Sequence, residues 1–88
     1  MDYIPIDQCK DGYLYEIDAR NASIGIYQAA KKTFVISRNK FGENFLCEED
    51  HWDYDNGTAK PLKEIVKAPD EGLLEWLNVK EKEHDVHM

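Results

Sequence analysis

The chain has little cysteine and no long apolar run. Its two cysteines, Cys9 and Cys47, are too few for a disulfide framework, so we expect free thiols in a reducing compartment. No apolar stretch approaches the roughly 20 residues that are needed to span a bilayer. The opening residues, Met-Asp-Tyr-Ile-Pro-Ile-Asp, lack the basic start and apolar centre of a signal peptide. These absences predict a cytoplasmic protein without a membrane contact.

Length and net charge narrow the class of protein further. The 88 residues are expected to form one domain with a thin core over residues 1–79, followed by a charged, frayed tail over residues 80–88. A net charge of −7 disfavours general nucleic-acid binding, which needs a basic footprint. It is typical of a protein that binds a basic surface or only needs to stay soluble. The identity of a partner and the oligomeric state stay open.

What the sequence does contain is a sharp division of charge. Residues 19–42 carry five basic residues and no acid: Arg20, Lys31, Lys32, Arg38 and Lys40. Residues 43–55 carry six acids and no Lys or Arg: Glu43, Glu48, Glu49, Asp50, Asp53 and Asp55. Aromatic residues lie among these acids, which a purely solvated run of charge does not need. The division indicates a binding surface.

Apolar and polar residues alternate in the first half of the chain. This pattern predicts four short strands, over residues 13–18, 23–28, 33–38 and 44–48. Gly25 inside the second strand indicates a bulge or a close approach of the backbone. The predicted fold is α+β: a four-stranded antiparallel β-meander or small barrel, with one or two short C-terminal helices.

The pattern changes after residue 55. Residues 58–66 are predicted to form a short helical turn with Pro61 near its start. Asp70 is a candidate N-cap for a second helix that continues through Leu77. A terminal strand over residues 74–79 is the alternative, because Gly72 weakens the helical pattern.

The spacing of the candidate metal ligands does not match that of known metal sites. Asp53, Asp55 and Glu64 have the carboxylate spacing of a calcium-binding EF-hand loop, but Thr58 replaces the glycine that this loop requires. Structural zinc needs four ligands at short spacings, and the chain offers two separate pairs: Cys47 with His51, and His84 with His87. We therefore expect no metal and no cofactor.

The candidate catalytic residues lack the geometry that catalysis requires. His51 would have to act as the base for the Cys47 thiol, but in a strand the two residues would lie over about 12 Å apart. The adjacent carboxylates Glu48, Glu49 and Asp50 offer nothing that raises one pKa selectively above the others, as acid–base catalysis requires. We predict that the protein is not an enzyme.

The acidic and aromatic segment is the candidate binding surface. Aromatic side chains and complementary charge concentrate binding energy and association rate, respectively. The segment therefore predicts a small, acidic, protein-binding module whose partner presents a basic surface. Trp52 is either a core residue or a contact residue. The predicted binding residues are Glu48, Glu49, Asp50, Trp52, Asp53, Tyr54 and Asp55.

A single-stranded nucleic-acid binder is the alternative. The basic residues of segment 20–40 would contact phosphates, with Tyr27, Phe34 and Phe41 as stacking platforms. The residues assigned to this function are Arg20, Lys31, Lys32, Arg38 and Lys40. Neutralisation of this segment by the neighbouring acids is the simpler interpretation, so nucleic acid is not the expected partner.

Several short motifs occur between residues 12 and 62. They are Gly12-Tyr13-Leu14-Tyr15, Ala19-Arg20-Asn21, Phe41-Gly42, Asn44-Phe45-Leu46, Glu49, His51-Trp52-Asp53, Gly57-Thr58-Ala59 and Pro61-Leu62. With them the chain resembles small uncharacterised phage and bacterial proteins. The resemblance implies a small accessory protein, of a phage or mobile element, that binds and modulates a host protein. It implies no catalytic or ligand-binding residue.

Overall fold

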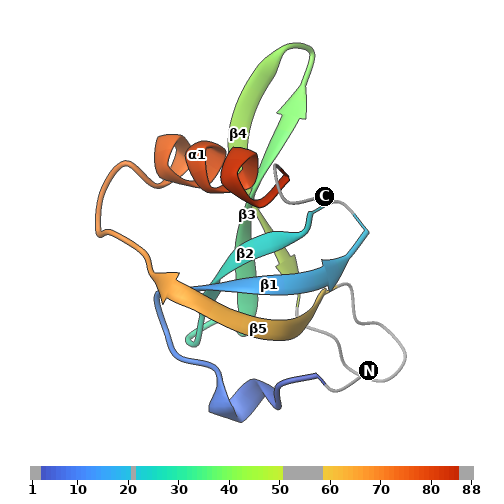
Figure 1. The fold of residues 1–88 in the computed structure, drawn as a ribbon, viewed down its shortest axis with the longest axis vertical. Coiled ribbons are helices and arrows are strands. Elements are labelled where there is room, and N and C mark those ends of the chain that lie inside the picture. The colour runs from blue at the N-terminus through green and yellow to red at the C-terminus, as the bar shows by residue number, and fades with distance from the viewer. Residues whose placement is uncertain (1–2, 21, 51–58, 86–88) are drawn as a thin grey trace.

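The computed structural model describes residues 3–20, 22–50 and 59–85, which form one open antiparallel sheet and one C-terminal helix (Figure 1). Within these ranges the sheet has five strands in the order β4-β3-β2-β1-β5. The elements are a 3₁₀ turn at Ile6–Gln8, β1 Tyr13–Ala19, β2 Ile24–Gln28, β3 Thr33–Lys40, β4 Glu43–Asp50, β5 Ala59–Lys67 and α1 Leu73–Asp85. The predicted α+β class is confirmed. The prediction of four strands is wrong, and the sheet is open rather than a barrel.

The central strands β1, β2 and β3 bury side chains on both faces, because successive residues of a strand point to opposite sides. One set packs under the helix and is called the helix-side core: Leu14, Ile24, Ile26, Val35, Ala68 and Leu77. The other set is called the far-side core: Tyr15, Ile17, Tyr27, Phe34, Ile36 and Ala59. Ile4 and Ile6 of the N-terminal segment pack against the far-side core. Each face of the sheet thus has its own cover.

Helix α1 lies across the face that carries the helix-side core (Figure 1). Leu77 is fully buried there, with Leu73 and Trp76 packed beside it. The Ser37 hydroxyl also donates a hydrogen bond to Asn78 Oδ1 at 2.7 Å, which ties α1 to β3. The apolar positions recur at helical spacing, and this periodicity supports the helix.

Both predicted limits of this helix are wrong. The helix begins at Leu73, and the Trp76 N–H donates to the Gly72 carbonyl at 3.0 Å, so Asp70 is not the N-cap. At the other end α1 continues to Asp85, where the sequence predicts a frayed tail from Lys80 onward. Lys80 and His84 remain half-buried against the sheet side, because they share the face of Leu77. The division into residues 1–79 and 80–88 stays a prediction.

Strand β5 replaces the helical turn predicted over residues 58–66. It pairs antiparallel with β1, from Ala19 opposite Ala59 to Tyr13 opposite Lys67, with two register shifts. Pro61 is tolerated because β5 is an edge strand, where a missing N–H need not break the ladder. The main chain of Ile4 covers part of this edge by donating to the Pro61 carbonyl at 2.8 Å.

Strands β3 and β4 form a long hairpin that projects beyond the helix and the rest of the sheet (Figure 1). They pair without a register shift, from Thr33 opposite Asp50 to Lys40 opposite Glu43. Phe41 and Gly42 alone form the loop, with φ of 54° and 80°. Positive φ at both central residues is what a type I′ turn requires. Both strands extend further than predicted, because the two-residue turn lets pairing continue to its base.

Candidate functional site

The two edges of the sheet differ in how they are protected against strand pairing. Natural edges are blunted by lysine, proline, bulges or a covering segment. Edge strand β5 has all four: lysines at 60, 63 and 67, a proline at 61, two register shifts and the contact from Ile4. Strand β4 contains no Lys or Pro and pairs with β3 in continuous register. No described segment pairs with its outer side.

The acidic residues of the predicted surface lie partly on this open edge. Cross-strand partners share a face, so Glu48 lies with Val35 on the helix side and Glu49 lies with Phe34 on the far side. Asp50 is the last residue of β4. The acids therefore occupy both faces of the β4 edge. The other predicted binding residues lie outside the described part of the chain: Trp52, Asp53, Tyr54 and Asp55.

A shallow pocket, called the edge pocket, lies along β4 on the helix side. Its volume is about 230 Å³. Val35, Leu46 and Leu73 supply apolar walls from β3, β4 and the start of α1, and Glu48 supplies a carboxylate. Gln28 and Cys47 complete the lining. The pocket is therefore an apolar trough with an acid at its rim, beside the side of β4 with which no described segment pairs.

The Glu48 carboxylate already has a cationic partner. Lys31, from the loop between β2 and β3, places Nζ 3.0 Å from Glu48 Oε1. The two side chains are 63% and 40% exposed, so this ion pair is solvated and worth at most about 1 kcal/mol. Sequence analysis assigned Lys31 and Glu48 to two different functions, and the structure brings them together.

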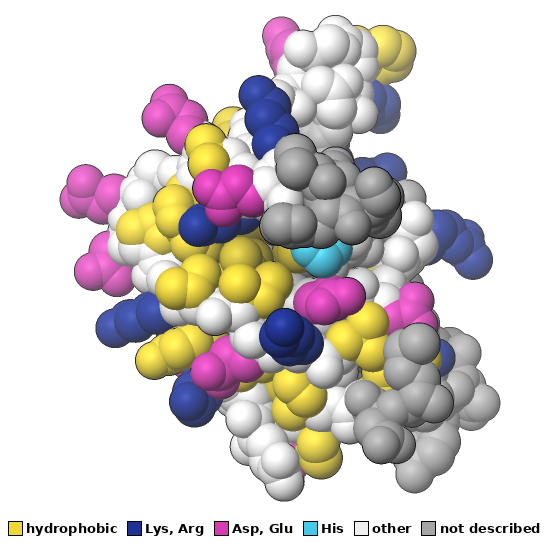
Figure 2. Space-filling view, in the orientation of Figure 1, with side chains coloured by type: hydrophobic (Ala, Val, Ile, Leu, Met, Phe, Trp, Pro, Cys, Tyr) yellow, Lys and Arg dark blue, Asp and Glu magenta, His cyan; other side chains and the backbone are white. Residues whose placement is uncertain are grey.

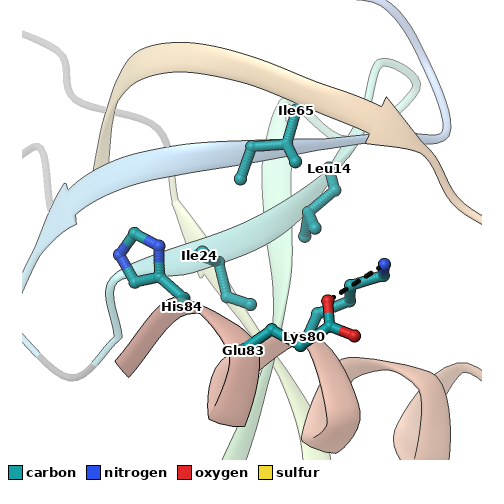
Figure 3. Close-up of a pocket in the computed structure, with 6 residues that line it drawn as sticks. All are labelled: Leu14, Ile24, Ile65, Lys80, Glu83 and His84. Atoms are coloured by element: carbon teal, nitrogen blue, oxygen red, sulfur yellow. Dashed lines mark hydrogen bonds and ion pairs between the residues drawn. The ribbon is translucent and has the colours of Figure 1, made fainter. Parts of the chain in front are cut away.

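A second pocket, called the helix pocket, lies between the C-terminal half of α1 and the sheet (Figure 3). Its volume is about 190 Å³. Leu14, Ile24 and Ile65 form its apolar floor, and Figure 2 shows apolar side chains gathered over this region beside α1. The rim comes from α1: His84, together with Lys80 and Glu83, whose Nζ and Oε2 lie 3.3 Å apart. Its described lining contains no Ser, Thr, Cys or Tyr that could act as a nucleophile.

The two thiols are not activated. Burial raises the pKa of Cys9 to about 11 and outweighs its hydrogen bond with Tyr15, which acts in the opposite direction. Burial also raises the pKa of Cys47, against an opposing effect of Arg38. Thiolate is the nucleophilic form of cysteine, so both groups are poor nucleophiles at neutral pH. Cys47 is half-buried and packs against the far-side core.

The basic residues of the nucleic-acid hypothesis do not form one surface. Lys31 and Lys32 lie in the loop before β3, whereas Arg38 and Lys40 lie near its other end, and Arg20 follows β1. At about 3.3 Å per residue, the two ends of β3 are roughly 23 Å apart. Tyr27 and Phe34 are buried in the far-side core and cannot act as stacking platforms.

The tip of the β3–β4 hairpin presents Phe41, which sequence analysis assigned only to the nucleic-acid alternative and did not expect in a strained turn. Phe41 is 93% exposed and adopts a left-handed φ, two unfavourable conditions for an aromatic residue. Lys40 Nζ lies 5.5 Å from the centre of its ring, and Asn39 Nδ2 donates to Asn44 Oδ1 at 2.8 Å below it. The available signal was Gly42, because a glycine after one residue in a short loop is typical of a type I′ turn.

Comparisons with known proteins give no family. No family model, curated protein or solved structure matches the chain. Among residues 3–20, 22–50 and 59–85, no three His, Cys, Asp or Glu side chains gather closely enough to hold a metal ion. The described helix is too short and too polar to cross a membrane.

Proposed function

We propose that the protein is a non-enzymatic binding module that adds an extended, basic segment of a partner protein to the open edge of β4. The observation that carries the proposal is the contrast between the edges: β5 is protected by several devices, and β4, with no described partner on its outer side, is not. Phe45 and Leu46 are also 38% and 39% exposed on β4, which gives an added strand apolar contacts. Strand addition is a common mode of peptide recognition.

The charge of the edge selects the partner. Glu43, Glu48 and Glu49 lie along β4, and the whole protein carries a net charge of −7. Complementary charge speeds association and rejects partners of the wrong sign. Trp52 and the acids at 53 and 55 continue this composition along the sequence, and their participation stays a prediction. The cytoplasmic location and the role as a phage or mobile-element accessory protein also stay predictions.

The hairpin geometry identifies the main-chain groups of β4 that would bind an added strand. In a two-residue hairpin, Lys40 and Glu43 exchange both hydrogen bonds, and such pairs alternate with pairs that exchange none. Asn44, Leu46 and Glu48 therefore direct their N–H and C=O groups away from β3. A proline at one of these positions removes an outward donor and leaves the pairing with β3 intact.

This geometry defines a matched test with an acetylated, amidated Lys-Val-Lys-Val-Lys-Val-Lys peptide as the probe. We expect Leu46→Pro to abolish binding, whereas Leu46→Thr, which keeps the N–H, retains it. Raising salt from about 50 mM to about 500 mM should weaken binding severalfold, because exposed charges are screened. Isothermal titration calorimetry measures both effects.

The binding test has two controls. Asn44→Pro serves as a second blocking variant, and a thermal melt shows that each variant is folded. The corresponding Glu-Val peptide should bind more weakly than the Lys-Val peptide. Equal binding by wild type and both proline variants, or a preference for the acidic peptide, would refute the proposed function.

A further inference from the structure

We infer that the edge pocket is a specificity site for one arginine or lysine side chain of the docked segment, and that Lys31 acts as an internal competitor for its carboxylate. This inference rests on the proposed function, because the side chain must arrive on a strand added to β4. It goes further by naming the residue type that the segment must carry, and it gives Lys31 a role.

The position of the pocket matches the side-chain spacing of an added strand. Residues on one face of a strand alternate with those on the other, so every second side chain of the segment would lie on the helix side. There it would meet Leu46 and Glu48, which are two residues apart on the same face of β4. Leu73 of α1 closes the trough opposite them. One side chain of the segment is therefore directed over the pocket.

The lining selects a long cationic side chain. Val35, Leu46 and Leu73 would contact an aliphatic stem, and the Glu48 carboxylate at the rim would pair with a cation at its end. An aliphatic side chain would also fill the trough. It would, however, displace water from the Glu48 carboxylate without offering a cation or a hydrogen-bond donor in its place. An acidic side chain would face Glu48 directly. Arginine suits the site best, because its planar head can donate two hydrogen bonds to one carboxylate.

Lys31 shows that a cation is accommodated at this carboxylate. Its Nζ lies 3.0 Å from Glu48 Oε1 in the free protein, and its side chain is 63% exposed. It is anchored in a loop and does not line the pocket, so it pairs with the acid without filling the trough. A docked arginine would contact both the apolar walls of the trough and the Glu48 carboxylate. It must first displace Lys31, which lowers the apparent affinity of the segment.

The test uses three heptapeptides of alternating Thr and Val that differ at the central residue: arginine, its neutral isostere citrulline, or leucine. We expect arginine to bind wild-type protein about tenfold more tightly than citrulline, which corresponds to about 1.4 kcal/mol. Glu48→Gln should remove this preference. Lys31→Met should strengthen binding of the arginine peptide severalfold and leave the citrulline peptide unchanged.

The matched control is Glu75→Gln, which removes one exposed carboxylate of α1 that does not line the pocket. It should leave all three affinities unchanged. Equal binding of the arginine and citrulline peptides, with binding still blocked by Leu46→Pro, would overturn this inference and leave the proposed function standing. Weaker binding of the arginine peptide to Lys31→Met would overturn the role of Lys31. Failure of the arginine peptide to bind wild type, at concentrations where the Lys-Val peptide binds, would also overturn this inference.

Discussion

At the scale of single residues, Phe41 combines two features that do not favour stability. It lies at the tip of a projecting hairpin with its side chain 93% exposed and its φ at 54°. A left-handed conformation costs a residue with a Cβ roughly 1–2 kcal/mol, and asparagine tolerates it better. Such local strain is typical of functional positions.

We therefore predict that Phe41→Asn stabilises the protein by about 0.5–1 kcal/mol. The gain comes from the turn, because the exposed ring loses only its contact with Lys40. The free energy of urea unfolding measures it. Phe45→Asn is the matched control, since Phe45 lies in regular strand on the same hairpin and should lose stability instead. A loss of stability in Phe41→Asn would show that the ring packs against the protein.

The polar cluster around Tyr15 predicts a response to alkaline pH. The Lys10 N–H donates to Tyr15 Oη at 2.7 Å, and Tyr15 Oη donates to Glu64 Oε1 at 3.4 Å. Burial raises the pKa of Tyr15 and raises that of Cys9 from 9.0 to about 11. Both groups bind their protons more tightly in the folded state. The contribution of Cys9 to stability is therefore complete below pH 9 and is lost as pH rises towards 11, and that of Tyr15 is likewise lost as pH rises above its ordinary pKa.

Thermal melts between pH 8 and pH 11.5 test this response, and the melting temperature should fall most steeply above pH 9. Cys9→Ala should make the fall shallower, because one of the groups with a raised pKa is gone. A profile of wild type that stays flat through this range would contradict the burial of these groups.

Residue patterns predicted the positions of the three central strands well. Gly25 is an example, because the sequence indicates a close approach there and the structure supplies it. A Cβ at this position would lie 3.0 Å from Phe34 Cβ and 3.2 Å from two isoleucine side-chain atoms. For Phe41 the sequence offered only Gly42 as a signal, because exposure and a positive φ depend on the two-residue turn that β3 and β4 share.

At the scale of elements, α1 is attached to the sheet mainly through Leu77. The side chain is fully buried among the helix-side core, and the next residue, Asn78, accepts the hydrogen bond from Ser37. Truncating a buried leucine removes its transfer energy and leaves a cavity. The helix should therefore contribute much of the stability of the whole domain.

We predict that Leu77→Ala lowers the free energy of unfolding by about 2–5 kcal/mol, measured by urea denaturation. Val79→Ala on the same helix is the control, since Val79 is 53% exposed and its truncation should change stability by less than about 0.5 kcal/mol. Similar losses from the two variants would contradict the observed docking of α1.

Two elements were not predictable, for physical reasons. Strand β5 contains Pro61 and exposed lysines, and its conformation is set by pairing with β1, whose residues lie 40 or more positions away in sequence. The local sequence pattern does not reveal a strand-pairing partner that is so distant in sequence. The last two turns of α1 are polar, so they gave no apolar period. Their helical state follows from continuation of a helix that Leu73, Trp76 and Leu77 hold on the sheet.

At the scale of the whole molecule, charge and topology combine. Strand β5 carries three lysines and one glutamate, whereas β4 carries three glutamates and one aspartate, so the two edge strands differ in the sign of their net charge. The sequence showed the acidic segment, but it did not show that β4 would be an edge strand. Nor did it show that Lys31 would face Glu48, because that contact joins a loop to a strand across the hairpin. The site is therefore a product of strand order as much as of composition.

The central claim is that the outward main-chain groups of β4 bind an added strand. Residue-resolved amide hydrogen exchange by NMR, with and without the Lys-Val peptide, tests it most directly. The account predicts that the amides of Asn44, Leu46 and Glu48 exchange rapidly in the free protein and become protected when the peptide is bound. Those of Phe45, Cys47 and Glu49 should be protected in both states. New protection confined to β5, or none along β4 at a peptide concentration that saturates binding, would contradict the account.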